Sequence, residues 1–284
     1  MITVDPLPAA LGARILDIDL SSPLDVADES RVRETLFEYQ VIVVPAQDLQ
    51  PGDLVAFARR FGRPVPHVLS HLRLPDFPEI LPLSNTFEDG KPTGVYDGAA
   101  YWHTDMSYED PPGSVTLVHS IHAPQAGGDT RFANMFRAYE TLDDTMRRRI
   151  DGLTVLHHYG NRQDLEDSSR TSAFPLTEEQ KATVRNVFHP LVRPHPATGR
   201  KALYGISGSS FGIVGMPDDE ARALLDELKA HATREEFVYQ HHYRVGDVVA
   251  WDNYSTLHAA TLIPPATGTA HTRYLHRISV KEAT

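Results

Sequence analysis

Short stretches in which apolar and polar residues alternate recur along most of the chain. Alternation with a period of two is clearest in residues 13–20 and 115–123, and it is typical of strands with one face in the core. Short apolar runs such as 41–44 predict further, fully buried strands. The complete set of predicted strands is 13–20, 41–44, 79–83, 115–123, 153–158, 187–192, 201–206, 237–243, 248–251 and 274–280, and a tight turn over 127–130 leads into 131–133.

Apolar residues spaced three and four apart predict a smaller number of helices. The clearest case covers residues 218–232, where Ala221, Leu224, Leu225 and Leu228 form an apolar stripe in front of a charged face. The other predicted helices are 28–40, 54–61, 135–142 and 144–150. The early part of the chain therefore reads as a strand–helix–strand–helix unit.

Many short strands separated by glycine and proline turns favour a mainly β fold. With a few flanking helices, the order of elements indicates a double-stranded β-helix core, the jelly roll of cupin-like proteins. No repeat, linker or low-complexity tract divides the 284 residues, so we predict one domain over 1–284. Residues 161–180 are polar and aperiodic, which predicts a mobile lid or, alternatively, a surface insertion.

Composition narrows the classes of chemistry and partner. The chain has no cysteine, which excludes disulfides and thiolate ligands, so a metal here must be held by histidine and carboxylate. A net charge of −11 argues against nucleic-acid and membrane partners, which require a basic face. No run of 18 apolar residues and no secretory leader pattern occurs, which predicts a cytoplasmic protein.

The most suggestive residues for chemistry are His103 and Asp105, which lie two positions apart. In an extended segment their side chains would leave on the same face, so both could bind one ion. A second imidazole would complete the two-histidine, one-carboxylate facial triad of non-haem Fe(II) enzymes. His258, which follows the apolar run 248–251, is the candidate for that third ligand.

Four motifs in order resemble the taurine dioxygenase (TauD/TfdA) family of Fe(II)- and 2-oxoglutarate-dependent oxygenases. The resemblance runs from about residue 11 to 280 and includes the segment 190–196. The motifs are His103-x-Asp105 after Trp102, Gly127-Gly128-Asp129-Thr130, Trp251-Asp252-Asn253 with His258, and Arg273-x-x-x-Arg277. Such a resemblance implies Fe(II) as cofactor, 2-oxoglutarate and O₂ as cosubstrates, and a dimer or tetramer.

Residue by residue, the resemblance makes His103, Asp105 and His258 the iron ligands. It places Thr130 and Arg273 on the distal carboxylate of 2-oxoglutarate. Arginine suits this role because its planar, permanently charged fork matches a carboxylate. For Asp129 and Asp252 we expect structural roles.

The substrate side of the site is predicted from the same resemblance. Arg277 would bind the anionic group of the substrate, since it shares a strand face with Arg273, and His67 resembles a histidine that contacts a sulfonate. His71 is a weaker candidate, and Tyr159 and Phe211 are expected to supply apolar walls.

Two positions depart from the family pattern. Tyr254 stands where an arginine usually follows Trp-Asp-Asn, and Ala99 stands where the taurine enzyme has an asparagine. The stretch between His258 and Arg273 is also longer than in the taurine enzyme. Taurine itself is therefore not the expected substrate.

The predicted function is a dioxygenase that hydroxylates a small anionic organic substrate while 2-oxoglutarate is decarboxylated to succinate. A sulfonate, sulfate ester or aryloxyalkanoate would fit, with cleavage of a C–S or C–O bond as one outcome. The alternatives are a pathway-specific oxygenase of a carboxylate or amino-acid-derived metabolite, a zinc hydrolase with the same ligands, and a non-catalytic jelly-roll binding protein.

Overall fold

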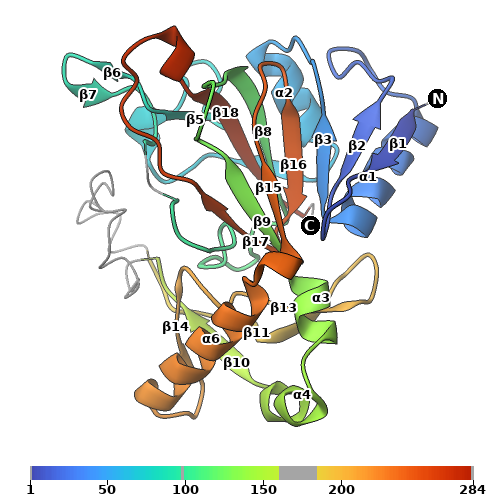
Figure 1. Ribbon diagram of the computed structural model, residues 1–284, viewed down its shortest axis with the longest axis vertical. Coiled ribbons are helices and arrows are strands. Elements are labelled where there is room, and N and C mark those ends of the chain that lie inside the picture. The colour runs from blue at the N-terminus through green and yellow to red at the C-terminus, as the bar shows by residue number, and fades with distance from the viewer. Residues whose placement is uncertain (1, 97–98, 160–183, 283–284) are drawn as a thin grey trace.

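The apolar strands come together in one eight-stranded sheet, as the computed structural model shows (Figure 1). The structure describes residues 2–96, 99–159 and 184–282, so the predicted lid over 161–180 lies outside it. The strand order is β1-β2-β3-β16-β8-β18-β4, and β5 also pairs with β18. The bounds are β1 (Thr3–Pro6), β2 (Ala13–Leu16), β3 (Val41–Val44), β4 (Arg63–Val65), β5 (Leu81–Ser84), β8 (Val115–His122), β16 (Val248–Asp252) and β18 (Tyr274–Lys281).

A second, three-stranded sheet packs against one face of the large sheet. Its order is β15-β9-β17, with β15 (Val238–His241), β9 (Thr130–Asn134) and β17 (Thr256–Ala260). Phe132 of this sheet shares a hydrophobic cluster with Val118 and Trp251 of the large sheet. The core between the two sheets is therefore apolar on both sides, as in a β-sandwich.

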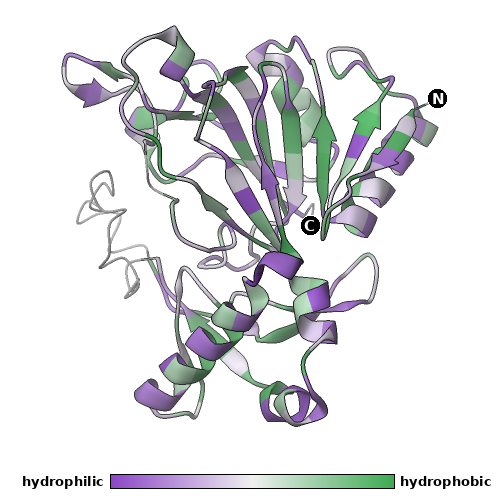
Figure 2. Cartoon of the chain, in the orientation of Figure 1, coloured by the Kyte–Doolittle hydropathy of each residue, from purple (hydrophilic) through white to green (hydrophobic). Residues whose placement is uncertain are grey.

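Two helices cover the opposite face of the large sheet. They are α1 (Val26–Tyr39) and α2 (Pro51–Ala58), and Leu36 and Phe57 pack with Leu117 in a second cluster. Leu117 and Val118 are consecutive on β8 and point to opposite faces, so both faces of this strand are buried. Figure 2 shows the resulting contrast between hydrophobic central strands and helices with one polar face.

The remaining helices and short strands form the lower part of the molecule in Figure 1. Leu224 and Leu228 of α6 are fully buried there, together with Phe136 and Ile213. The elements are α3 (Met135–Glu140), α4 (Asp144–Ile150), α6 (Asp218–Ala232), β10 (Thr154–His157), β11 (Val187–Pro190), β12 (Val192–Pro194), β13 (Lys201–Leu203) and β14 (Ser210–Ile213). Small elements elsewhere are β6 (Phe87–Glu88), β7 (Lys91–Pro92), η1 (Ser70–Leu72), η4 (Glu235–Phe237) and η5 (Thr269–His271).

Several predicted boundaries were wrong for local reasons. The strand predicted over 13–20 ends at Leu16, because Asp17 has φ 61° and leaves the extended conformation. The helix predicted from residue 54 begins at Pro51, which lies at the first helical position inside a capping box. Residues 85–100, for which no element was predicted, contain the β6–β7 hairpin, and β1, β4 and β14 were not predicted either.

The mainly β architecture with flanking helices is as predicted. Among the helices that the structure describes, none combines the length and the apolarity needed to cross a lipid bilayer.

Candidate metal centre

His103 and His258 are held side by side by an antiparallel β-bridge. The backbone amide of each donates to the carbonyl of the other, at 2.9 and 2.8 Å. The two imidazole ring centroids are consequently 4.1 Å apart. His258 belongs to β17, whereas His103 makes only this isolated bridge, so one strand of the second sheet positions both rings.

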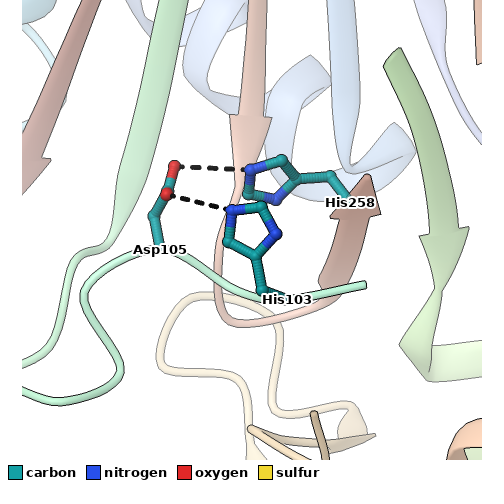
Figure 3. Close-up of side chains that lie close together, drawn as sticks. All are labelled: His103, Asp105 and His258. Atoms are coloured by element: carbon teal, nitrogen blue, oxygen red, sulfur yellow. Dashed lines mark ion pairs between the residues drawn. The ribbon is translucent and has the colours of Figure 1, made fainter. Parts of the chain in front are cut away.

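Asp105 completes a cluster of three potential metal ligands (Figure 3). Its Oδ1 lies 3.7 Å from His103 Nε2, and its Oδ2 lies 3.6 Å from His258 Nε2. One ligand atom from each residue lies within 4.8 Å of the others, and all three residues are buried. These distances are too long for hydrogen bonds, so the three side chains face a common gap.

Asp105 lies outside the named strands, since only His103 of this segment makes a β-bridge. The chain turns directly after Asp105, where Met106 has φ 54°, and Gly113 packs against the turn. The chain therefore leaves the metal centre directly after its second ligand. In the part of the chain that the structure describes, this is the only cluster of three such ligand residues.

The protonation states suit metal binding. His103 Nδ1 is 2.9 Å from the carbonyl oxygen of Tyr101, which can only accept, so Nδ1 carries the proton and Nε2 presents its lone pair. Burial, together with the neighbouring His103, lowers the pKa of His258 well below its usual value, although Asp105 acts in the opposite direction. His258 is therefore neutral near pH 7, as metal coordination requires, and His103 keeps Nε2 turned towards the gap.

The carboxylate is ionised for a different reason. Burial alone would raise the pKa of Asp105, but Arg277, the two histidines and a hydrogen bond from Thr116 outweigh burial and lower it. An ionised carboxylate beside two imidazoles matches the donor set of the Fe(II) facial triad. The residues present thus fit a divalent iron ion.

A second polar cluster is centred on Arg273. This guanidinium is buried, and among the described residues no carboxylate lies within ion-pair distance of it. Its Nε donates to the Gly128 carbonyl at 2.9 Å, and its guanidinium lies 5.8 Å from the Tyr243 ring centroid. Thr130 Oγ1 is 2.9 Å from the hydroxyl of the same tyrosine. A buried, unpaired guanidinium is a binding site for a carboxylate, because a buried charge is costly without a counter-ion.

The glycine motif before Thr130 has a steric explanation. Gly128 has φ +69°, and a Cβ added there would lie 2.8 Å from Arg273 Cδ. Gly128 therefore allows Arg273 to pack directly against the backbone of the turn.

Two residues of this cluster were not predicted from the sequence. Tyr243 joins Thr130 to Arg273, as described above. Asn85 accepts a hydrogen bond from the Arg273 amide at 2.8 Å and donates to the carbonyls of Pro264 and His271, both at 2.9 Å. Neither residue carries a sequence signal, because both contacts join segments that are far apart in the chain.

Comparisons with known proteins agree with this geometry. The family model described as taurine catabolism dioxygenase TauD, TfdA family, matches residues 3–279. The chain belongs to this dioxygenase family.

Curated relatives and solved structures are similar over nearly their full lengths. The alpha-ketoglutarate-dependent 2,4-dichlorophenoxyacetate dioxygenase of Cupriavidus pinatubonensis is 33% identical, over 90% of this chain and 91% of that protein. Pentalenolactone F synthase of Streptomyces arenae is 32% identical, over 93% and 91%. The crystal structure of AAD-2 in complex with Mn(II) and N-oxalylglycine is 30% identical, with a TM-score of 0.81 over 99% of this chain and 97% of that chain.

These comparisons confirm several predictions made from the sequence. The family, the jelly-roll fold class and the Fe(II)/2-oxoglutarate-dependent dioxygenase class are as predicted, and so are the cofactor and cosubstrate. A zinc hydrolase and a non-catalytic binding protein are not supported.

The predicted substrate residues of the dioxygenase come together only in part. Arg277 and His67 line the same pocket, together with Tyr108. Tyr159 packs edge-on against Tyr108, with ring centroids 4.6 Å apart, so it borders the pocket. The other lining residues are Val65, Pro66, Val68, Glu79, Leu81, Met106, Glu109 and Ser279.

Two further candidates lie elsewhere. His71 is exposed on η1 and does not line this pocket. Phe211 is a half-buried residue of β14 in the lower part of the molecule, and no described contact joins it to the pocket.

The departures from the family pattern have structural explanations. Tyr254 is buried, and the guanidinium of Arg193 lies 4.1 Å from its ring centroid. Asp252 is fully buried, accepts a hydrogen bond from the Tyr254 amide at 3.0 Å and lies 3.1 Å from His195 Nε2. The Ala99 carbonyl accepts from the Ala260 amide at 2.8 Å, next to β17. None of these contacts reaches a metal ligand.

Proposed function

We propose that this dioxygenase binds Fe(II) through His103, Asp105 and His258 and hydroxylates a small anionic organic substrate anchored at Arg277. The observation that carries the proposal is the buried triad, in which one ligand atom of each residue lies within 4.8 Å of the others. Iron, when bound, supplies the oxidation: one atom of O₂ enters a C–H bond, and the other converts 2-oxoglutarate into succinate and CO₂.

The residues of the chain bind and orient the reactants. Arg273 and Thr130 bind the distal carboxylate of 2-oxoglutarate, and Tyr243 holds the Thr130 hydroxyl in place. Burial of the triad and of Arg273 excludes bulk water, which strengthens these charged contacts and protects a reactive oxidant. Positioning is thus the protein's main contribution.

The pocket supports an anionic substrate with an apolar part. Arg277 supplies the positive charge and His67 a second polar contact, whereas Val65, Val68 and Leu81 are apolar. A 2,4-dichlorophenoxyacetate dioxygenase is among the relatives, and the family is named for taurine, so an aryloxyalkanoate, a sulfonate or a sulfate ester fits. Cleavage of the C–O or C–S bond follows if hydroxylation occurs at the carbon next to the heteroatom.

A second candidate is a pathway-specific oxygenase acting on a carboxylate or amino-acid-derived metabolite. Similarity to pentalenolactone F synthase favours it, because that relative is named for the product it synthesises. Glu79 also lines the pocket and suits a substrate that carries an amino group, whereas the Glu109 carboxylate is paired with Lys281 at 2.5 Å.

The metal assignment is tested by an anaerobic titration with Fe(II) and 2-oxoglutarate. We expect a weak visible charge-transfer band in the wild type and none in His103→Ala. Absence of the band in the wild type, or its persistence in His103→Ala, contradicts the assignment.

The substrate assignment is tested with Arg277→Ala. Succinate formation is first measured with aryloxyalkanoates, alkyl sulfates, taurine and amino-acid derivatives. Stimulation by the active compound should be lost in Arg277→Ala while the band persists; loss of the band would place Arg277 on the cosubstrate.

Three predictions from the sequence concern the protein as a whole. A single domain over 1–284, a dimer or tetramer, and a cytoplasmic location remain predictions. Light scattering after size-exclusion chromatography determines the oligomeric state.

A further inference from the structure

Each oxygen of Asp105 has a partner outside the ligand triad. Thr116 Oγ1 donates to Oδ2 at 2.7 Å, and Arg277 Nη2 lies 2.7 Å from Oδ1. Ser279 connects these two partners, since its Oγ is 3.1 Å from Thr116 Oγ1 and 3.0 Å from Arg277 Nη2. The four side chains form a closed ring beside the metal ligands.

Adjacent strands of the large sheet build this ring. Thr116 on β8 pairs directly with Ser279 on β18, and Arg277 is two residues before Ser279 on the same face. Thr116 is fully buried, and Ser279 and Asp105 are nearly so. Because Thr116 is β-branched, its side chain has few alternative rotamers with which to leave the ring.

The direction of every hydrogen bond in the ring is determined. The Thr116 hydroxyl has a single proton, and it is donated to Asp105 Oδ2. Thr116 therefore accepts from Ser279 and from the Asn253 amide nitrogen, which is 3.0 Å away. Ser279 in turn accepts from Arg277, because a guanidinium only donates. Along this path each group donates to the next one: Arg277 to Ser279, Ser279 to Thr116, and Thr116 to Asp105.

We propose that Thr116 is a positioning residue for the metal centre, with Ser279 orienting its proton. The inference rests on the proposed function, in which Asp105 is a metal ligand. Without Thr116 the Asp105 carboxylate could rotate about its Cβ–Cγ bond, and its orientation would be set by the Arg277 contact alone. With Thr116 in place, the plane of the carboxylate is fixed towards His103 and His258.

The same ring ties the metal ligand to the substrate anchor. Arg277 contacts Asp105 directly and Ser279 on the other side, so its guanidinium is held at the edge of the pocket. Thr116 and Ser279 thereby keep the metal ligand and the anion-binding group in one fixed relation.

Thr116→Val is the informative substitution, because it keeps the shape of the side chain and removes the donor. Partners that orient a metal ligand typically change metal affinity 10–100-fold, so we expect Thr116→Val to bind Co(II) about 10–100-fold more weakly. The d–d absorption of bound Co(II) should also change. Thr116→Ser, which keeps the hydroxyl, should restore both, and Ser279→Ala should show a smaller loss.

Thr35→Val is the matched control. Thr35 is a buried threonine of α1 whose hydroxyl donates to the Arg31 carbonyl at 2.7 Å, so the same atoms are exchanged outside the metal centre. Its Co(II) affinity should equal that of the wild type. Circular dichroism and thermal unfolding of each apoprotein show whether a variant is folded.

The outcomes separate this inference from the proposed function. Wild-type protein without Co(II) binding, or binding that survives in His103→Ala, overturns the metal assignment itself. Suppose instead that the wild type binds Co(II) and His103→Ala does not. If Thr116→Val then has the same Co(II) affinity and absorption spectrum as the wild type, the role of Thr116 is overturned and the metal assignment stands. If Thr116→Val does not fold, Ser279→Ala is the test. The same Co(II) affinity and spectrum as in the wild type would then overturn the proposal that the ring positions Asp105.

Discussion

Gly127 and Gly128 offer a matched pair of substitutions that isolates the contact between the glycine turn and Arg273. Both have positive φ, +76° and +69°, so alanine at either position adopts an unfavourable backbone conformation. They differ in what the new Cβ meets. At Gly127 the nearest atom is the Leu262 carbonyl oxygen at 4.0 Å, whereas at Gly128 it is Arg273 Cδ at 2.8 Å, with Ile263 Cδ1 at 3.2 Å.

The size of each effect follows from these contacts. The left-handed backbone costs about 1–2 kcal/mol for alanine, so both variants should lose about that much stability. In Gly128→Ala the side chain of Arg273 must also move, since a separation of 2.8 Å cannot be kept. A hydrogen bond to a charged group contributes about 1.5–3 kcal/mol, which corresponds to a roughly 10–150-fold change in affinity for 2-oxoglutarate.

The measurement is the dissociation constant of 2-oxoglutarate, from the visible band of the anaerobic Fe(II) complex. Gly127→Ala should keep the wild-type constant and Gly128→Ala should not, although urea unfolding should place the two at similar stability. Equal 2-oxoglutarate affinity in the two variants would refute the steric argument or the role of Arg273.

Three further predictions concern stability, each measured by urea unfolding. Asp252→Ala removes the acceptor of the Tyr254 amide and the Ser255 hydroxyl in a fully buried site and should cost about 1–3 kcal/mol for each donor left without a partner; a change within about 0.5 kcal/mol contradicts these contacts. Burial and the neighbouring His189 lower the pKa of His157 to about 3, whereas the unfolded value is 6.5. Between these values only the unfolded state binds the proton, so stability should fall as pH drops from 6.5 towards 3, by up to about 1.4 kcal/mol per pH unit, and His157→Gln should remove this contribution. Leu224→Ala on α6 should cost about 2–5 kcal/mol because the side chain is fully buried, and a change within 0.5 kcal/mol, expected for surface sites, would contradict its place in the core.

The sequence pattern predicted an element best where residues within that element carried the whole periodicity or apolar run. The helix over 218–232, the helix over 144–150 and the strand over 41–44 have the predicted bounds, because a helical periodicity or an apolar run lies within each of them. Boundaries failed where a single residue left the expected φ range, as at Asp17, or where a short strand such as β14 depends on pairing with β10.

Residue types in ordered motifs were enough to single out the candidate ligands and the family. His103, Asp105, His258, Thr130 and Arg273 were all found this way, because the donors of a metal or carboxylate site must be histidine, carboxylate, hydroxyl or guanidinium. The structure adds that these residues meet: one β-bridge joins His103 to His258, and Tyr243 joins Thr130 to Arg273.

What the sequence determined by itself was the chemistry available to the protein, together with the apolar pattern that makes strands and helices. Only the tertiary structure decided which hydroxyls and amides support that chemistry, as with Thr116, Ser279 and Asn85. The physical reason is that a hydrogen bond depends on distance and direction between two groups. When strands far apart in sequence supply those groups, nothing in the residues near either group indicates that they meet.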